Sequence, residues 1–204
     1  MRIDHLAIAC QTLAEGVTYA EQALGLPLPP AIGQHPLMGT HNRLLSLGGA
    51  EYLEIIAIDP AAPPPGRARW FGLDGFSGPP RIQAWICAED ASLGQTLAEM
   101  RQSGAGEIID FQRGPYQWQM AVPDSGLLPF DGLQPAQILW QSSPPALDLP
   151  TSPCRLERLI LSHPQPEALA QRLTRLNDPR LQIGYAPQPQ IRAEIRSPQG
   201  LCLL

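Results

Sequence analysis

The chain contains no lysine, and all fourteen of its basic residues are arginine. A Schiff base needs a lysine amine and a phosphate-binding P-loop needs its lysine, so both chemistries are excluded. The arginines form no basic run, so nucleic-acid binding is not expected. No GxGxxG follows a strand and no GxSxG occurs, so neither a Rossmann dinucleotide site nor a serine nucleophile elbow is indicated.

Long apolar runs and paired cysteines are missing too. No stretch of about 18 apolar residues could span a bilayer, so no membrane association is expected. The N-terminus enters a strand at once, so we expect no signal peptide and a cytoplasmic protein. No CxxC occurs, and the four cysteines are predicted to be reduced, mostly core thiols: Cys10, Cys87, Cys154 and Cys202.

A strand followed by a helix of similar length is predicted three times. The strands are Ile3–Ala9, Ile82–Ala88 and Leu156–Ser162. The helices, each with one apolar stripe, are Thr12–Leu24, Ala91–Ser103 and Pro164–Leu176. Thr12 is expected to cap the first helix and Gly25 to end it. Helices with single apolar stripes lie on one face of a sheet, which predicts an α+β fold with helices on the outer face.

Three more strands are predicted after each helix, which makes βαβββ modules, two full and one compressed, with curved mixed sheets. The first set is Ala31–His35, Thr40–Leu47 and Glu51–Ile58. The second set is Glu107–Arg113, Tyr116–Val122 and Ala136–Gln141. The third set is Gln182–Ala186, Ile191–Ser197 and Leu201–Leu204.

Proline clusters coincide with the module boundaries, and proline stiffens connections and cannot donate to a sheet ladder. We therefore predict one compact unit with modules at 1–60, 82–143 and 155–204, a Pro/Gly linker at 61–81 and a Pro-rich linker at 144–154.

His5 and Glu54 are predicted to lie on one concave face. Side chains alternate between the two faces of a strand. If the first helix covers the face of Leu6 and Leu53, then His5 and Glu54 project from the opposite face. The residues expected beside them on that face are Ile3, Ala7, Ala9, Tyr52, Ile56 and Ile58.

Glu54 stands in an apolar strand, and a buried carboxylate must be paired, protonated or metal-bound. His5 would be its partner in a functional site. A structural salt bridge to Arg43 is the alternative, and a lone strand histidine is itself more often structural. Without a metal, an apolar setting would raise the pKa of Glu54 and suit it as a general base.

Two segments, GTHNRL at Gly39–Leu44 and YLEIIA at Tyr52–Ala57, resemble the glyoxalase-like domain family of the vicinal oxygen chelate superfamily. The superfamily includes glyoxalase I, extradiol dioxygenases and bleomycin-resistance proteins. The resemblance implies lyase, isomerase or dioxygenase chemistry on a small oxygenated metabolite. The alternative is a non-catalytic protein that sequesters a small molecule. A homodimer is also expected.

Metal enzymes of the superfamily take ligands from the first and fourth strands of two modules. His5 and Glu54 match these positions in the first module. The second module has Ala84 and either Gln137 or Leu139 there. The resemblance implies a divalent metal such as zinc, iron, nickel or manganese. His41 is the candidate third ligand, because two histidines and one carboxylate can bind iron or zinc. The other two histidines are predicted to be surface or capping residues: His35 and His163.

Tyr116, Trp118 and Met120 alternate along a strand and share a face. They would form either ordinary core or an apolar wall beside a ligand, with Arg43 or Arg113 binding an anionic group. The predicted substrate-binding residues are Arg43, Asn42, Tyr116 and Trp118.

Overall fold

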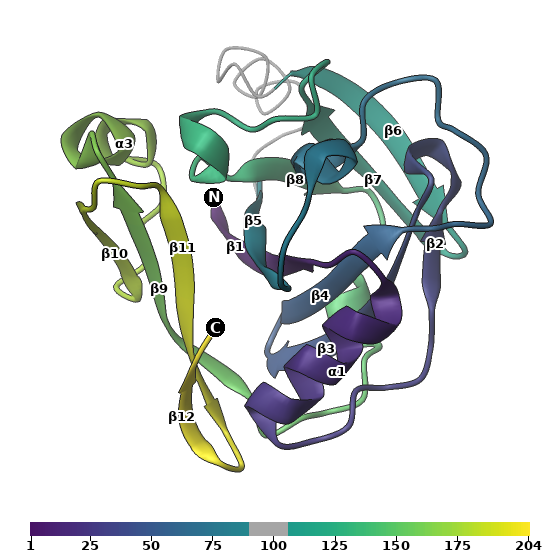
Figure 1. The fold of residues 1–204 in the computed structure, drawn as a ribbon, viewed down its shortest axis with the longest axis horizontal. Helices are drawn as coiled ribbons and strands as arrows, with labels where there is room; N and C mark the ends of the chain where they lie inside the picture. Colours follow the sequence, from purple (N-terminus) through teal and green to yellow (C-terminus); the bar gives the residue numbers. More distant parts are fainter. Residues whose placement is uncertain (90–105) are drawn as a thin grey trace.

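The computed structural model describes residues 1–89 and 106–204 (Figure 1). One curved sheet contains β1 (Arg2–Ala9), β2 (Gly33–His35), β3 (Thr40–Gly48), β4 (Glu51–Ile58), β5 (Arg81–Ala88), β6 (Glu107–Arg113), β7 (Tyr116–Val122) and β8 (Ala136–Trp140). Their spatial order is β2-β3-β4-β1-β5-β8-β7-β6. The predicted α+β class with curved mixed sheets is confirmed, and the described residues form mostly strands with few helices.

The two halves of this sheet share one pattern of strand pairing. In the first half β1 pairs parallel with β4, while β4 with β3 and β3 with β2 are antiparallel. In the second half β5 pairs parallel with β8, while β8 with β7 and β7 with β6 are antiparallel. β1 and β5 join the halves as an antiparallel pair. The edge strands β2 and β6 contact each other, so the sheet curls around its inner face (Figure 1).

A smaller sheet follows, with β9 (Arg155–His163), β10 (Leu181–Tyr185), β11 (Gln190–Ser197) and β12 (Gly200–Leu203) in the order β10-β9-β11-β12. Its pairing differs from that of the larger sheet. The first strand of this segment, β9, pairs parallel with the strand that follows its helix, β10, and antiparallel with β11. The helix α3 (Pro166–Arg172) is shorter than predicted.

The first helix, α1 (Leu13–Leu24), has the predicted caps. The Glu15 N–H donates to Thr12 Oγ1 at 3.2 Å, and Gly25 ends the helix in the left-handed conformation with φ 71°. Gly16 packs so closely on Cys10 and Ile55 that a side chain there would clash with both. The other predicted helix, Ala91–Ser103, lies outside the described residues.

The outer face of the curved sheet is buried under α1 and the smaller sheet. The core between them includes Leu6, Ile8, Leu53, Ile55, Val17, Ala20, Leu24, Leu159, Leu161, Leu169 and Ile195. The prediction that the first helix covers the Leu6 and Leu53 face is confirmed. Because burial of apolar surface drives folding, the packed outer face stabilises the fold. Functional groups must therefore lie on the inner face.

Four short 3-10 segments lie between the strands, and the first two bury side chains in the inner core: η1 (Pro36–Met38), η2 (Trp70–Gly75), η3 (Phe130–Gly132) and η4 (Pro145–Leu147). η2 belongs to the stretch 61–81, predicted as a linker, and it also buries Trp70, Phe71 and Leu73 in the inner core. Phe71 has a left-handed backbone, φ 58°, which is uncommon for an aromatic residue, and its ring stacks on Trp70.

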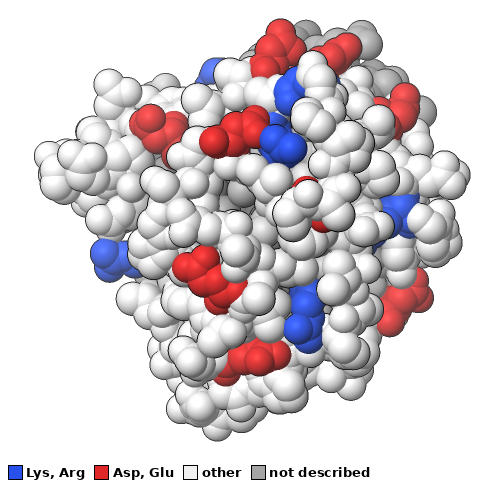
Figure 2. Space-filling model, turned by 45° about the vertical axis from the view of Figure 1, so that its right-hand side comes forward, with Lys and Arg blue, Asp and Glu red and all other residues white. Residues whose placement is uncertain are grey.

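Figure 2 shows that charged side chains are scattered over one face of the molecule among uncharged residues and do not gather in a patch of one sign. Of the helices in the described residues, none has the length and apolar character needed to cross a membrane. The four cysteines are free, and three of them are buried.

Candidate functional site

A β-bulge in β1 directs two consecutive polar side chains into one network. The pairing with β5 shifts between Ile3, opposite Cys87, and His5, opposite Ile86, so Asp4 is an extra residue that breaks the alternation. Ile3 consequently packs in the outer core, and its predicted place beside His5 is wrong. Asp4 Oδ1 lies 2.6 Å from His5 Nδ1.

His5 and Glu54 come together on the inner face. In the parallel pair of β1 and β4, His5 lies opposite Tyr52 and Ala7 opposite Glu54. The His5 ring stacks on Tyr52 with 4.3 Å between ring centroids. His5 Nε2 lies 3.6 Å from Glu54 Oε2, and both side chains are 6% exposed. That separation exceeds an ordinary hydrogen bond, so the two groups face the same small space.

This pair lies in the middle of a longer polar chain. Trp140 Nε1–H donates to Asp4 Oδ2 at 2.9 Å. Asn42 Nδ2–H donates to Glu54 Oε1 at 2.6 Å, and Asn42 Oδ1 accepts from Arg113 Nη1 at 3.1 Å. The chain runs across the inner face from β6 to β8 and holds the imidazole and the carboxylate in fixed orientations.

Arg113 joins the two edges of the curled sheet. Besides Asn42 on β3, its Nη1 donates to His35 Nε2 on β2 at 3.3 Å. A guanidinium can only donate, so His35 Nε2 is the acceptor nitrogen and Nδ1–H can donate to Thr40 Oγ1 at 3.1 Å. Gly33 lies so near the Arg113 guanidinium and the Asn42 amide that a Cβ would clash with both.

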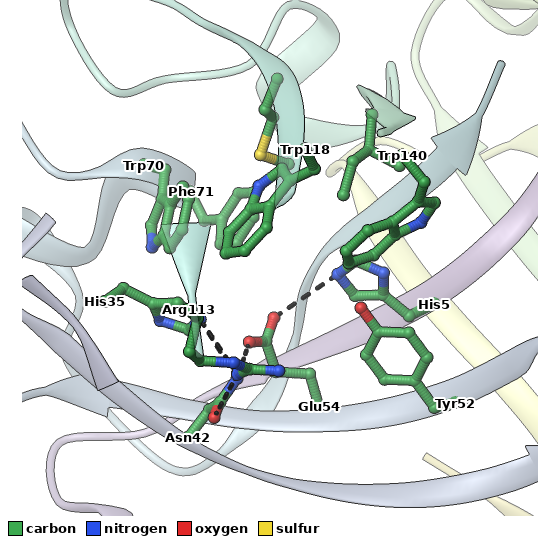
Figure 3. A pocket seen from close by; sticks show the side chains of 12 residues that line it. His5, His35, Asn42, Tyr52, Glu54, Trp70, Phe71, Arg113, Trp118 and Trp140 are labelled. Carbon is green, nitrogen blue, oxygen red and sulfur yellow. Dashed lines mark hydrogen bonds and ion pairs between the residues drawn. The ribbon is translucent and has the colours of Figure 1, made fainter. Parts of the chain in front are cut away.

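Aromatic rings enclose the other side of the space. In Figure 3, Trp70, Phe71, Trp118 and Trp140 lie on one side of the pocket, and the polar residues lie on the other. The inner cavity measures about 30 Å³, roughly the volume of one water molecule. An outer groove of about 670 Å³ adjoins it, and the two share Asn42 and Arg113 as lining residues. Residues from segments 29–36, 112–116 and 145–150 line the groove.

Burial and the nearby carboxylates together set the ionisation of the two inner histidines. Burial lowers the pKa of His5, but the hydrogen bond with Asp4 and the nearby Glu54 carboxylate outweigh burial and raise the pKa to about 9. Burial raises the pKa of Glu54, but His5 and Asn42 outweigh it and lower the pKa to about 2. The expected rise in the Glu54 pKa is therefore wrong. Burial lowers the pKa of His35 to about 4, so this ring is neutral.

A family model described as glyoxalase-like domain matches residues 3–177. The chain belongs to the glyoxalase-like domain family. The resemblance to this family that the GTHNRL and YLEIIA segments carry is confirmed. No curated protein matches the sequence.

Several solved structures are similar to this glyoxalase-like domain. A hypothetical protein from Staphylococcus aureus has a TM-score of 0.59 at 12% identity, over 99% of this chain and 84% of that one. Methylmalonyl-CoA epimerase from Mycobacterium tuberculosis has a TM-score of 0.46 at 18% identity, over 72% and 91%. A Streptomyces coelicolor methylmalonyl-CoA epimerase has a TM-score of 0.44 at 19% identity, over 70% and 95%. At such identities the first of these supports the fold alone.

The donor set of this glyoxalase-like domain does not fit a divalent metal. Within residues 1–89 and 106–204, no three His, Cys, Asp or Glu side chains are grouped so that they could hold an ion. His5 Nε2 and Glu54 are two donors, and a metal site in a protein usually needs at least a third. His41, the predicted third ligand, is next to Asn42 on β3, so its side chain projects from the opposite face of the strand. Its Nδ1 lies 4.0 Å from Asp59 Oδ1 instead.

The second half of the sheet places no metal-binding side chain in the inner cavity at the positions predicted for ligands. Neither Gln137 nor Leu139 lines the inner cavity, whereas Ile138 between them does. Gln137 Nε2–H donates to the buried Glu89 Oε1 at 3.0 Å. Ala84 is fully buried in the inner core.

Among the predicted substrate-binding residues, Asn42 and Trp118 line the inner cavity. Tyr116 lies in the outer groove, where its O–H donates to Asp148 Oδ2 at 3.0 Å. Arg43 does not reach the site. Its Nε donates to Pro29 O at 2.7 Å and its Nη2 to Leu28 O, so it neither pairs with Glu54 nor faces a ligand there.

The two remaining histidines were predicted to be surface or capping residues, and both are buried. His35 is buried beside the cavity, so its expected surface or capping place is wrong. His163 is buried too, and its Nδ1 accepts from the N–H of Gln165, the residue before α3, at 3.0 Å, but no side-chain hydrogen bond caps the helix.

Asp4 and Trp140 were missed. A carboxylate directly before His5 in an apolar strand was a usable signal for Asp4, because such a group needs a partner. Trp140 gave no comparable signal, since its indole N–H reaches Asp4 only through the pairing of distant strands.

Proposed function

We propose that this protein is an enzyme that moves a proton between carbon and oxygen of a small carbonyl compound, an isomerase- or lyase-type step that needs no metal ion. The observation that carries the proposal is the buried His5–Glu54 pair, whose reactive atoms face one cavity 3.6 Å apart. Asp4 engages the other imidazole nitrogen at 2.6 Å, as expected for a group that orients an acid–base histidine.

In this proposal Glu54 Oε2 removes a proton from the carbon next to the carbonyl, and His5 Nε2–H gives its proton to the carbonyl oxygen. The C–H electron pair becomes the C=C bond of an enol, and the carbonyl π pair forms the new O–H bond. Glu54 ends protonated and His5 neutral. A proton passed from Glu54 to His5 restores the starting ion pair.

A carboxylate with a pKa of about 2 is a weak base by itself. Simultaneous protonation of the oxygen compensates, because it avoids building up a full enolate charge. The burial of both side chains strengthens the two interactions, because a low-dielectric setting screens charge poorly. Asn42 holds the second oxygen of Glu54, which leaves Oε2 for the substrate.

The alternative is a non-catalytic protein that sequesters a small molecule. The apolar second wall, which adds no acid or base of its own among the described residues, favours this alternative. Binding without proton transfer would support it.

The test is exchange of C–H protons in D₂O, followed by NMR over a panel of ketones, aldehydes and oxo-acids. For a compound that the wild type exchanges, Glu54→Gln and His5→Gln are each expected to lower the rate by roughly 10²- to 10⁴-fold. His41→Gln is the matched control, because that histidine lies outside the site. Its rate should equal that of the wild type.

Two results would contradict the proposal. One is unchanged exchange in Glu54→Gln, and the other is binding of panel compounds by the wild type with no exchange of any of them. Dialysis against a chelator is expected to leave the rate unchanged. A loss that added zinc or manganese restores would instead establish metal chemistry.

A further inference from the structure

We infer that the substrate is a 2-oxocarboxylate with an apolar chain, that Arg113 binds its carboxylate, and that the outer groove holds the chain. The inference rests on the proposed function, because it names the substrate class for the same site. Three features carry it: the charge of Arg113, its position, and the unequal sizes of the two cavities.

Arg113 is a half-buried cation whose partners are neutral. It contacts Asn42 Oδ1 and His35 Nε2, and its guanidinium carbon lies 5.7 Å from the Tyr116 ring centroid. No ion pair joins it to an acidic side chain in the part of the chain that the structure describes. A half-buried charge without a counterion favours an anion from outside. A guanidinium suits a carboxylate best, since its parallel N–H groups match both oxygens. Other arginines already have carboxylate partners: Arg69, Arg158, Arg175, Arg180 and Arg196.

The cation lies where the inner cavity meets the outer groove, because Arg113 and Asn42 line both. The amide of Asn42 bonds the guanidinium through its oxygen and Glu54 through its nitrogen. One amide group therefore separates the anion-binding group from the proposed base. A carboxylate bound at Arg113 places the next one or two carbons of the ligand toward Glu54 and His5.

The two cavities divide the ligand into a small and a large part. The inner cavity of about 30 Å³ admits little more than a carbonyl group. The outer groove of about 670 Å³ has the size of an ordinary small-molecule site. Prolines make up much of its wall, and Ile32 lies there with 60% of its surface exposed. Such a wall gains free energy by covering an apolar chain.

A 2-oxocarboxylate meets these constraints together. Its carbonyl is bonded directly to the carboxylate carbon, so binding at Arg113 directs the carbonyl oxygen toward His5 Nε2–H. The acidic C–H on the following carbon then faces Glu54. The rest of the chain turns back into the groove.

The test is calorimetric titration with three probes: 2-oxooctanoate, the neutral 2-octanone and the short 2-oxobutanoate. Wild-type protein is expected to bind 2-oxooctanoate at least about tenfold more tightly than either of the others, a difference near 1.4 kcal/mol. Arg113→Gln should bind 2-oxooctanoate no better than 2-octanone, while Arg113→Lys keeps part of the preference. The control is Arg192→Gln, an exposed arginine bonded to Gln190, which should behave as wild type.

Ile32→Ser tests the groove. This substitution should weaken the binding of 2-oxooctanoate by about threefold and leave the binding of 2-oxobutanoate unchanged. The inference is overturned if 2-octanone binds wild type as tightly as 2-oxooctanoate, or if folded Arg113→Gln keeps the preference. Failure of the proposed function looks different: the three probes then show the expected ranking, but 2-oxooctanoate undergoes no C–H exchange. If only uncharged ketones undergo C–H exchange, the inference about the substrate is wrong and the proposed function is supported.

Discussion

The two halves of the curved sheet have the same strand pairing, but the inner face of one half is polar and that of the other is mostly apolar. The β1–β4 half presents the acid–base groups His5 and Glu54 and the amide of Asn42. The β5–β8 half presents Trp118, Ile138 and other apolar groups, with Arg113 at its far edge. Strand pairing depends on the backbone, so it tolerates either kind of inner face. One half can therefore supply reactivity while the other excludes water.

The largest expected effect comes from the apolar half. Trp118 is buried and stacks on Phe111 with 5.4 Å between ring centroids. Trp118→Ala should lower the free energy of unfolding by about 3–5 kcal/mol, because it removes a large side chain from a closed wall. Chemical denaturation measures this. A loss below about 1 kcal/mol would show that the wall collapses around the gap or was never tightly packed.

In the polar half, stability should depend on pH through His5. Its pKa is raised from 6.5 to about 9, so its contribution is complete below pH 6.5 and is lost as pH rises through 9. The loss should approach about 3 kcal/mol in the wild type. Unfolding free energies of wild type and His5→Gln between pH 6 and pH 10 are expected to converge. Parallel curves would mean that His5 is neutral at pH 7.

His35 supplies the opposite control. Burial lowers its pKa from 6.5 to about 4, so its effect is a loss of stability as pH falls from 6.5 to 4. His35→Gln should flatten the acid side of the profile and leave the alkaline side unchanged. If His35→Gln also flattened the alkaline side of the stability profile, the titrations of His35 and His5 would be coupled.

A smaller effect is expected from Asp4, which acts on the reaction only through His5. Asp4→Asn should slow exchange by about 10- to 100-fold, as loss of an orienting carboxylate does elsewhere. It should also lower the pKa of His5, so that the alkaline limb of the rate profile moves below pH 9. A rate loss with no shift of that limb would indicate structural damage alone.

Much of this fold could be predicted because local signals agree with the tertiary contacts. The strands Glu51–Ile58 and Glu107–Arg113 have the predicted bounds, and Thr12 and Gly25 cap α1 as predicted. The division of the chain into modules stays a prediction. For the site, alternation placed His5 and Glu54 on one face because β4 is regular through Glu54.

The rest of the site depends on contacts that alternation does not encode. Arg113 stands far from Asn42 in the chain and reaches it only because β2 and β6 meet when the sheet curls. Arg43 was predicted both as a substrate-binding residue and as the alternative salt-bridge partner of Glu54. It lies one residue out of phase with Asn42 and therefore points to the other face.

By itself the sequence determined the strands, the first helix with its caps, and the meeting of His5 with Glu54, since each follows from period and local chemistry. Tertiary structure alone decided the bulge that brings Asp4 to His5, the arginine at the mouth of the cavity, and the lowered pKa of Glu54. These depend on strand register, sheet curvature and buried neighbours, and all three arise from residues far apart in the chain.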